Sequence, residues 1–271
     1  MTRTIPKSVL LAATALLALA ACRDEDPPAR SSTTQPPVPD VSVAALNAAV
    51  WPPAAAVEAA ETAVAAAPDP FAENNMIVLD MSGSMDASSC SGSYSSRAEA
   101  AKAALLTWIA ANPGDNVGLV SFSASGINVD APLGQGEAHA TALVGVIERL
   151  RPDRSTPLRD AMQMAQAELE RQAARQGGTG AYRMIVITDG EASKGQEPGR
   201  IVANITENPA NMIELHTIGF CIDGGHSLKD PERVFYTDAN SPEALKAGLD
   251  ATQGEAMGFD AATLDFEELQ P

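Results

Sequence analysis

Short apolar runs alternate with longer amphipathic segments from about residue 75 to residue 253 of the 271-residue chain. The runs are nearly uninterrupted, which is typical of strands covered on both faces in a parallel sheet. The strands are expected at 76–79, 117–123, 127–133, 182–188, 213–221 and 234–237. The segments between them predict helices at 97–111, 137–150, 158–174, 198–208 and 241–252. This alternation predicts an α/β fold with a doubly wound, mainly parallel sheet flanked by helices.

The strand expected at 127–133 differs from the others. It follows the strand at 117–123 after a short Ser125-Gly126 turn, a pattern that favours a hairpin. This strand is therefore expected to lie antiparallel at one edge of the sheet. Capping serines, prolines and glycines mark the helix ends, as where Asn112-Pro113-Gly114-Asp115 follows the helix at 97–111.

The first 22 residues carry a pattern of export. Two positive charges precede an apolar run at 9–21, which is too short to span a bilayer and has the length of a signal-peptide core. The run ends in Leu19-Ala20-Ala21-Cys22, which resembles the lipobox of bacterial lipoproteins. The resemblance implies that residues 1–21 are a lipoprotein signal peptide and that Cys22 is lipidated. An ordinary secretory signal with a chance cysteine is the alternative.

The residues after this cysteine bear on location and on domain boundaries. Arg23, rather than aspartate, follows the cysteine, which in Gram-negative lipoproteins of this kind favours the periplasmic face of the outer membrane. Residues 22–70 are rich in proline and alanine and predict a largely disordered tether, with a helix in its alanine-rich part. Residues 75–253 are the expected domain, and residues 254–271 are an acidic tail.

Composition narrows the classes of function. The hydrophobic fraction of 45% is enough for one sizeable core, and the net charge is −17. Such a charge argues against nucleic-acid binding and against electrostatic docking on anionic lipid. Contact with a membrane is therefore expected through the N-terminal lipid only.

The first strand of the domain ends in a group of oxygen-bearing side chains. Asp80, Ser82 and Ser84 follow the apolar run at 76–79 with the spacing D-x-S-x-S. Alternate residues of an extended turn project the same way, and carboxylate and hydroxyl oxygens suit a hard cation such as Mg²⁺. An ordinary polar turn is the alternative interpretation. Asp80 itself is expected to point to solvent at the strand end.

Two further oxygen donors are expected at the same place. Asp189 ends the strand at 182–188, and Thr156 immediately precedes the helix at 158–174. In a doubly wound sheet the functional crevice lies at the carboxyl ends of the strands. All five side chains are therefore expected to converge on that edge.

Taken together, these pieces resemble the von Willebrand factor type A domain. They occur in that family's order and cover about residues 75–253: DMSGSM at 80–85, VGLVSFS at 117–123, STPLRDAM at 155–162 and IVITDGEAS at 185–193. The resemblance implies the Rossmann-like fold of the family and a metal-ion-dependent adhesion site. It assigns to that site Asp80, Ser82, Ser84, Thr156 and Asp189. Where the family often has Gly-Gly-Thr, this chain has Asp153-Arg154-Ser155-Thr156.

The resemblance also implies a role. In this family the serines and the threonine contact a divalent ion directly or through water, and the aspartates often bind through water. The position left open accepts a carboxylate from a partner. The expected function is therefore a non-catalytic protein-binding module of the cell envelope, which binds an Asp or Glu of its protein ligand through Mg²⁺. Ca²⁺ and Mn²⁺ take the same oxygen ligands.

Other functions stay open. A divalent ion at this edge could activate water in a metal-assisted hydrolase, although no general base or nucleophile accompanies it by motif. The domain could instead be a structural spacer, in which a metal only stiffens loops, or its site could be degenerate and metal-free. A zinc site is not expected, because the spacing that such sites require is absent from His139, His216 and His226.

Cys90 and Cys221 are the only cysteines beyond Cys22. An exported chain meets oxidising conditions, and both residues are expected near the carboxyl edge of the sheet. The sequence therefore predicts a disulfide between them. Two unpaired small core residues are the alternative.

Overall fold

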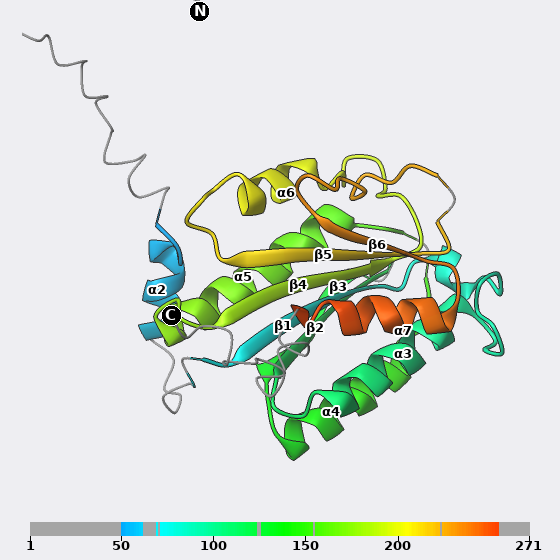
Figure 1. Ribbon diagram of the computed structural model, residues 1–271, viewed down its shortest axis with the longest axis horizontal. Helices are drawn as coiled ribbons and strands as arrows, with labels where there is room; N and C mark the ends of the chain where they lie inside the picture. The colour runs from blue at the N-terminus through cyan, green and yellow to red at the C-terminus, as the bar shows by residue number, and fades with distance from the viewer. Residues whose placement is uncertain are drawn as a thin grey trace, which may run out of the picture. The chain divides into compact units, whose positions relative to one another are not determined.

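The computed structural model describes residues 50–61, 69, 71–123, 126–153, 155–222 and 224–254. Within them six strands form one sheet in the order β3-β2-β1-β4-β5-β6 (Figure 1). The strands are β1 (Glu73–Asp80), β2 (Asn116–Ser123), β3 (Gly126–Gly134), β4 (Ala181–Thr188), β5 (Ile213–Phe220) and β6 (Phe235–Ala239). Strand β3 pairs antiparallel with β2, and all other neighbours are parallel. The predicted fold class and the antiparallel edge strand are confirmed.

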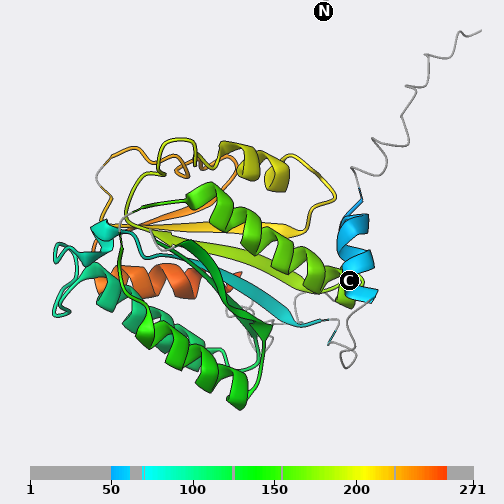
Figure 2. The same cartoon turned by 180° about the vertical axis from the view of Figure 1, so that it is seen from behind.

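Helices cover both faces of the sheet (Figures 1 and 2). One face carries α3 (Arg97–Ala111), α4 (Glu137–Arg149) and α7 (Pro242–Ala251), and the other carries α5 (Leu158–Gln176) and α6 (Gly199–Thr206). The alternation of side chains along β1 serves both layers, since Ile77 and Leu79 join the first core and Met76 and Val78 join the second. A short 3-10 helix, η1 (Gly83–Asp86), follows β1.

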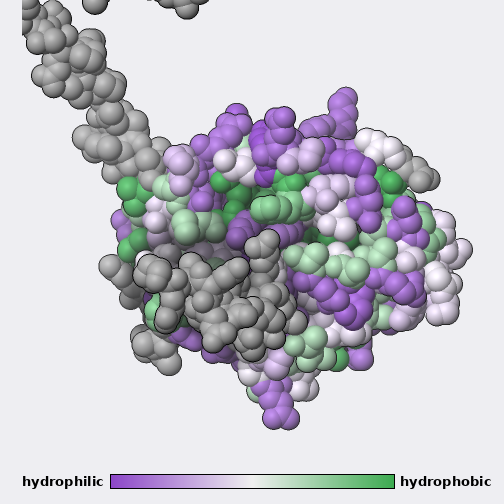
Figure 3. All heavy atoms as spheres, viewed as in Figure 1, coloured by the Kyte–Doolittle hydropathy of each residue, from purple (hydrophilic) through white to green (hydrophobic). Residues whose placement is uncertain are grey.

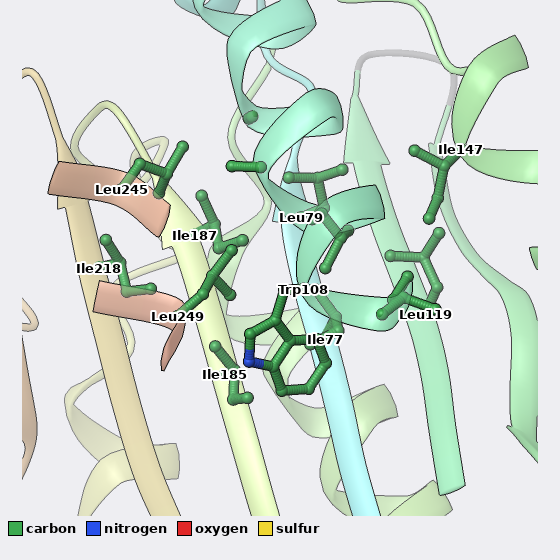
Figure 4. Packing of buried hydrophobic residues seen from close by; sticks show 14 of the residues in the cluster. Ile77, Leu79, Trp108, Leu119, Ile147, Ile185, Ile187, Ile218, Leu245 and Leu249 are labelled. Atoms are coloured by element: carbon green, nitrogen blue, oxygen red, sulfur yellow. The ribbon is translucent and has the colours of Figure 1, made fainter. Parts of the chain in front are cut away.

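The core under α3 is centred on Trp108, which is fully buried. Figure 4 shows its indole beside Ile77 and Ile185 of the two central strands. Truncating a fully buried tryptophan to alanine typically costs about 3–5 kcal/mol, so this contact fixes α3 firmly on the sheet. Ser96 caps the same helix, because its hydroxyl accepts a hydrogen bond from the backbone of Glu99 at 3.3 Å. The first residue of α3 is therefore held in a defined place at the carboxyl edge.

The described part of the expected tether contains a helix that packs on the domain. Helix α2 (Ala54–Glu61) contacts α5, and just before it the ring of Trp51 lies edge-on to Tyr182 at 4.9 Å. The expected signal peptide, Cys22 and residues 255–271 of the acidic tail lie outside the described residues. Among the described helices none has the length and apolar character needed to cross a bilayer.

Hydrophilic side chains dominate the described surface in the view of Figure 3, with apolar residues scattered between them. The large apolar side chains that the described residues expose come from separate segments: Val50, Val57, Phe71, Tyr94, Met212 and Phe235. Scattered apolar residues of this kind are ordinary on a soluble domain.

Candidate functional site

Three loops meet at the carboxyl edge of the sheet. Strands β1 and β4 are paired in register through Leu79 and Ile187, so the loops that follow Asp80 and Thr188 start side by side. The third loop precedes α5 and is tied to the first by a hydrogen bond from the Asp153 N–H to the Met81 carbonyl oxygen at 2.8 Å. The first of these contacts follows from the parallel pairing of β1 and β4, since neighbouring parallel strands end at the same edge.

Thr156 is tied to the segment that follows β4. Its N–H donates to the Ser193 hydroxyl at 3.0 Å, and its carbonyl accepts from the Ser193 N–H at 3.0 Å. The threonine is buried, and Leu158 begins α5 two residues later. The structure thus brings the loop of Thr156 next to the loops that carry the other four predicted residues.

A chain of hydrogen bonds joins the two serines to Asp189. The Ser84 hydroxyl donates to Asp189 Oδ1 at 2.6 Å, and the Ser82 and Ser84 hydroxyl oxygens lie 3.0 Å apart. Because a serine hydroxyl has one hydrogen and Ser84 gives it to Asp189, Ser82 must be the donor in the serine pair. Lone pairs of both hydroxyl oxygens therefore stay available to a further ligand. Ser82 is buried and Ser84 is exposed, so the chain runs from the interior to the surface.

Asp80 does not point to solvent, and that expectation is wrong. The residue is fully buried, and its two carboxylate oxygens accept hydrogen bonds from the Ser82 N–H and the Thr188 hydroxyl, each at 2.7 Å. The bonds turn the side chain back along the edge of the sheet instead of outward. Burial is the main cause that raises the pKa of Asp80 from 3.8 to about 6, and the hydrogen bonds from Ser82 and Thr188 oppose it. Sequence reasoning missed Thr188, although its place at the end of β4 beside Asp80 follows from the strand register.

Asp189 has a second partner, Arg97, which the sequence does not predict. Arg97, the first residue of α3, places its Nη1 2.8 Å from Asp189 Oδ2, and the carboxylate side chain is fully buried. The same guanidinium donates to the Ser89 carbonyl at 3.1 Å and to Cys221 Sγ at 3.2 Å. An arginine just after a helix cap is common on surfaces, so its position in the sequence alone carried no signal for this contact.

The predicted disulfide is confirmed. Cys90 and Cys221 are bonded, their Cα atoms lie 5.8 Å apart, and 131 positions separate them in the chain. The bond ties the loop between η1 and α3 to the end of β5. It also borders the site, because Cys221 contacts the guanidinium of Arg97.

His226 supports the segment that carries Asp189. Its Nδ1 accepts a hydrogen bond from the Leu228 N–H at 3.0 Å, so the ring hydrogen is on Nε2 and is donated to the Gly190 carbonyl at 2.8 Å. The residue is buried, although it follows two glycines in a loop. Its sequence context gives no sign of this contact, which depends on how the loop after β5 folds back.

The donor set fits a hard divalent cation. Within the described residues no three His, Cys, Asp or Glu side chains gather as a metal-binding group, so a cation at this edge must use hydroxyl oxygens as well. Ser82 and Ser84 supply such oxygens beside the carboxylates of Asp80 and Asp189, and Thr156 lies on the adjoining loop. Carboxylate and hydroxyl oxygens are the ligands that Mg²⁺, Mn²⁺ and Ca²⁺ accept. The exposed Ser84 leaves one side open to solvent.

Comparison with known proteins agrees with the fold. Residues 75–191 match the family model described as the von Willebrand factor type A domain. No curated protein sequence matches the chain. The matched residues include the D-x-S-x-S segment, the loop of Thr156 and Asp189.

Solved structures of low sequence identity share this architecture. The pilus adhesin SpaC from Lactobacillus rhamnosus GG is 18% identical with a TM-score of 0.51, and the match covers 68% of this chain and 30% of that chain. A von Willebrand factor type A protein from Catenulispora acidiphila is 18% identical with a TM-score of 0.52, over 69% of this chain and 43% of that chain. The SpRpn10 VWA domain is 17% identical with a TM-score of 0.50, over 66% of this chain and 95% of that domain. The chain therefore spans less than half the length of the first two proteins, and the likeness is one of fold.

Proposed function

We propose that this chain is a non-catalytic, divalent-cation-dependent protein-binding module held at a bacterial cell envelope. The observation that carries the proposal is the group of Asp80, Ser82, Ser84 and Asp189 in one hydrogen-bonded site at the carboxyl edge. The fold supports it, since one structure of this architecture is a pilus adhesin and residues 75–191 match the von Willebrand factor type A family.

Each residue of the proposed site has a distinct task. Ser82 and Ser84 offer hydroxyl lone pairs, and Thr156 adds a third hydroxyl from the next loop. Asp80 and Asp189 supply the negative charge, and the Thr188 hydroxyl and the Ser82 N–H hold Asp80 in place. A bound Mg²⁺, Mn²⁺ or Ca²⁺ supplies a positive centre that an Asp or Glu carboxylate of a protein ligand can contact. A neutral side chain gains no comparable charge-to-metal contact.

A metal-assisted hydrolase is the second candidate on the same edge. Such an enzyme needs a general base that can take a proton from water. His226 is the histidine hydrogen-bonded to this edge, and both of its ring nitrogens are engaged with backbone groups. This observation argues against His226 as that base, and binding therefore stays the first proposal. Turnover of an ester or phosphate substrate that is lost in Asp80→Asn would reverse the preference.

A structural spacer is the third candidate. In that case any cation would only stiffen the loops, and capture of a protein ligand would survive both chelation and Asp80→Asn. The exposed side of the site at Ser84 favours a binding role, because a purely stiffening ion does not need access to solvent.

The proposal includes anchoring of the chain to a membrane by lipidation of Cys22. This residue lies outside the described residues. The lipobox-like ending of the apolar run supports lipidation, and Arg23 supports the periplasmic face of the outer membrane. Mass spectrometry of the mature amino terminus should find an acylated cysteine. A mature protein that starts at another residue, or that keeps residue 1, would contradict the anchoring part alone.

Calorimetric titration with Mg²⁺ and Mn²⁺ tests the site. The wild type should bind one cation, and Asp80→Asn should bind it at least roughly tenfold more weakly, because it removes one of the two carboxylate charges. Asp130→Asn is a matched control, because Asp130 also accepts a backbone hydrogen bond at 2.9 Å, from the Ser121 N–H, but lies on the edge strand β3. Equal heats from the wild type and Asp80→Asn would refute the proposed site.

A further inference from the structure

Arg97 is held rigidly against the proposed cation site. Its Nη1 pairs with Asp189 Oδ2 at 2.8 Å, and the arginine side chain is only 13% exposed. On its other side the guanidinium is fixed by the carbonyl and hydroxyl of Ser89 and by Cys221 Sγ. The Cys90–Cys221 disulfide and the buried Trp108 anchor the two segments that hold it. The guanidinium of Arg97 therefore has little freedom to move away when a metal ion binds.

The charge balance of the site depends on this arginine. Among the residues that the structure describes, Asp80, Asp189 and Arg97 are three charged side chains joined by hydrogen bonds to the hydroxyl chain or to its carboxylates. With both carboxylates ionised, two negative charges and one positive charge leave a net charge of −1. The net charge of these three side chains then balances only part of the 2+ charge of a bound divalent ion.

We infer that Arg97 is an internal counter-charge that lowers the affinity of the site for a divalent cation and leaves the bound cation with excess positive charge. The inference rests on the proposed function and names Arg97 as the residue that determines the preference of the site for an acidic ligand over a neutral one. The excess charge is what an anionic group of a protein ligand would neutralise. Without Arg97 the two carboxylates would balance the ion alone, and the advantage of an acidic ligand over a neutral one would shrink.

A simple positioning role for Arg97 makes the opposite prediction. If the guanidinium only orients Asp189 towards the ion, removing it should weaken cation binding. If it acts as a counter-charge, removing it should strengthen binding, because the ion then meets a fully negative site. Charges within about 4–6 Å of each other shift a coupled equilibrium by roughly one to three powers of ten. A higher cation affinity on removal of Arg97 therefore indicates a counter-charge, and a lower affinity indicates a positioning role.

A double-mutant cycle measured by calorimetry with Mn²⁺ at pH 8 tests the inference. It uses the wild type, Arg97→Gln, Asp189→Asn and the double variant. Arg97→Gln should bind Mn²⁺ roughly ten- to a hundredfold more tightly than the wild type, and Asp189→Asn should bind more weakly by a similar factor. The double variant has the same net site charge as the wild type and should return to within about threefold of it.

The same four proteins are also checked for correct folding. Circular dichroism should show the same spectrum for all four proteins, and Arg97→Lys, which keeps the charge, should bind Mn²⁺ within about threefold of the wild type. If Arg97→Gln alone does not fold, the comparison of Asp189→Asn with the double variant carries the test. In that comparison the counter-charge role predicts tighter binding on loss of the arginine, and the positioning role predicts no change.

The outcomes separate this inference from the proposed function. Wild-type binding that is lost in Asp80→Asn, with Arg97→Gln binding no more tightly, overturns the inference and keeps the site. Binding by Arg97→Gln but not by the wild type would support a counter-charge role for Arg97 and would overturn cation-dependent binding by the native protein. Absence of Mn²⁺ binding from both proteins overturns the site and the inference together.

Discussion

Strand β1 ends in polar side chains at both edges of the sheet, and the two ends are built differently. At the amino edge Asn74 is fully buried and its amide donates to the Ala72 and Ala181 carbonyls and to Gln176 Oε1, at 2.9–3.0 Å. Its own oxygen accepts from Asn116 Nδ2 at 2.9 Å. At the carboxyl edge Asp80 is just as buried, but it is a carboxylate beside a second carboxylate.

The two ends of β1 differ in whether their polar side chains can satisfy one another. Neutral amides have both donors and acceptors, so Asn74 and its partners satisfy one another without any further ligand. Carboxylates only accept, and burying them costs free energy that their hydrogen bonds return only in part. Asn74 and the amides around it therefore satisfy one another, whereas the buried carboxylates of the carboxyl edge still favour a nearby positive charge. Arg97 supplies one such charge, and the proposed cation supplies the rest.

Removing the disulfide should have the largest effect on stability and should act on the carboxyl edge. Cys90→Ala with Cys221→Ala opens a loop of 131 positions, and loop-closure entropy predicts a loss of about 4–5 kcal/mol in the free energy of unfolding. Urea unfolding of the wild type with and without a reducing agent is the matched measurement. A loss below about 1 kcal/mol would show that noncovalent contacts alone hold this edge.

Asn74→Ala should be the most damaging single change at the amino edge, and it should leave the site intact. The substitution leaves several buried groups without a partner, so we expect a loss of roughly 3–4 kcal/mol in the free energy of unfolding. Asn204→Ala on the exposed face of α6 is the control and should change stability by less than about 0.5 kcal/mol. The Mn²⁺ affinity of Asn74→Ala should match the wild type. A parallel fall in affinity would mean that the two edges are coupled.

The metal-free protein should lose stability as the pH rises through the pKa of Asp80. The folded-state pKa is about 6 and the ordinary value is 3.8, so the folded state binds more protons between these values and ionisation above them opposes folding. The expected loss from below pH 4 to above pH 6 is up to about 3 kcal/mol. Asp80→Asn should lack this component, so the difference between the two proteins in chelator isolates it. A difference that does not vary with pH would mean that Asp80 is not desolvated in solution.

The sequence predicts the sheet well because each of its strands carries a local signal. The apolar runs and the Ser125-Gly126 pattern were sufficient for the approximate strand positions, the mainly parallel sheet and the antiparallel edge, but the polar start of β1 at Glu73 was not expected. The pairing of Cys90 with Cys221 followed from elimination among three cysteines. These features depend on the chain's own pattern and not on where side chains meet.

The proximity of four predicted residues follows from the sequence, whereas their burial and charge partners do not, and cation binding by them stays a prediction. The D-x-S-x-S spacing and the ends of β1 and β4 located Asp80, Ser82, Ser84 and Asp189. Asp80 is hydrogen-bonded to Thr188 on the neighbouring strand, 108 positions away, and Asp189 is ion-paired with an arginine 92 positions away. No local pattern encodes such contacts, because they arise only when α3 and β4 are packed in place.

The most direct test of the account is a crystal structure of the protein with Mn²⁺, with anomalous data collected at the manganese edge. One anomalous peak is expected at the carboxyl edge, within coordination distance of the Ser82 and Ser84 hydroxyls and near Asp80 and Asp189. Crystals of Asp80→Asn grown in the same solution should lack it. A peak elsewhere in the wild type, or the same peak in Asp80→Asn, would contradict the claim that this edge of the sheet is a cation-dependent binding site.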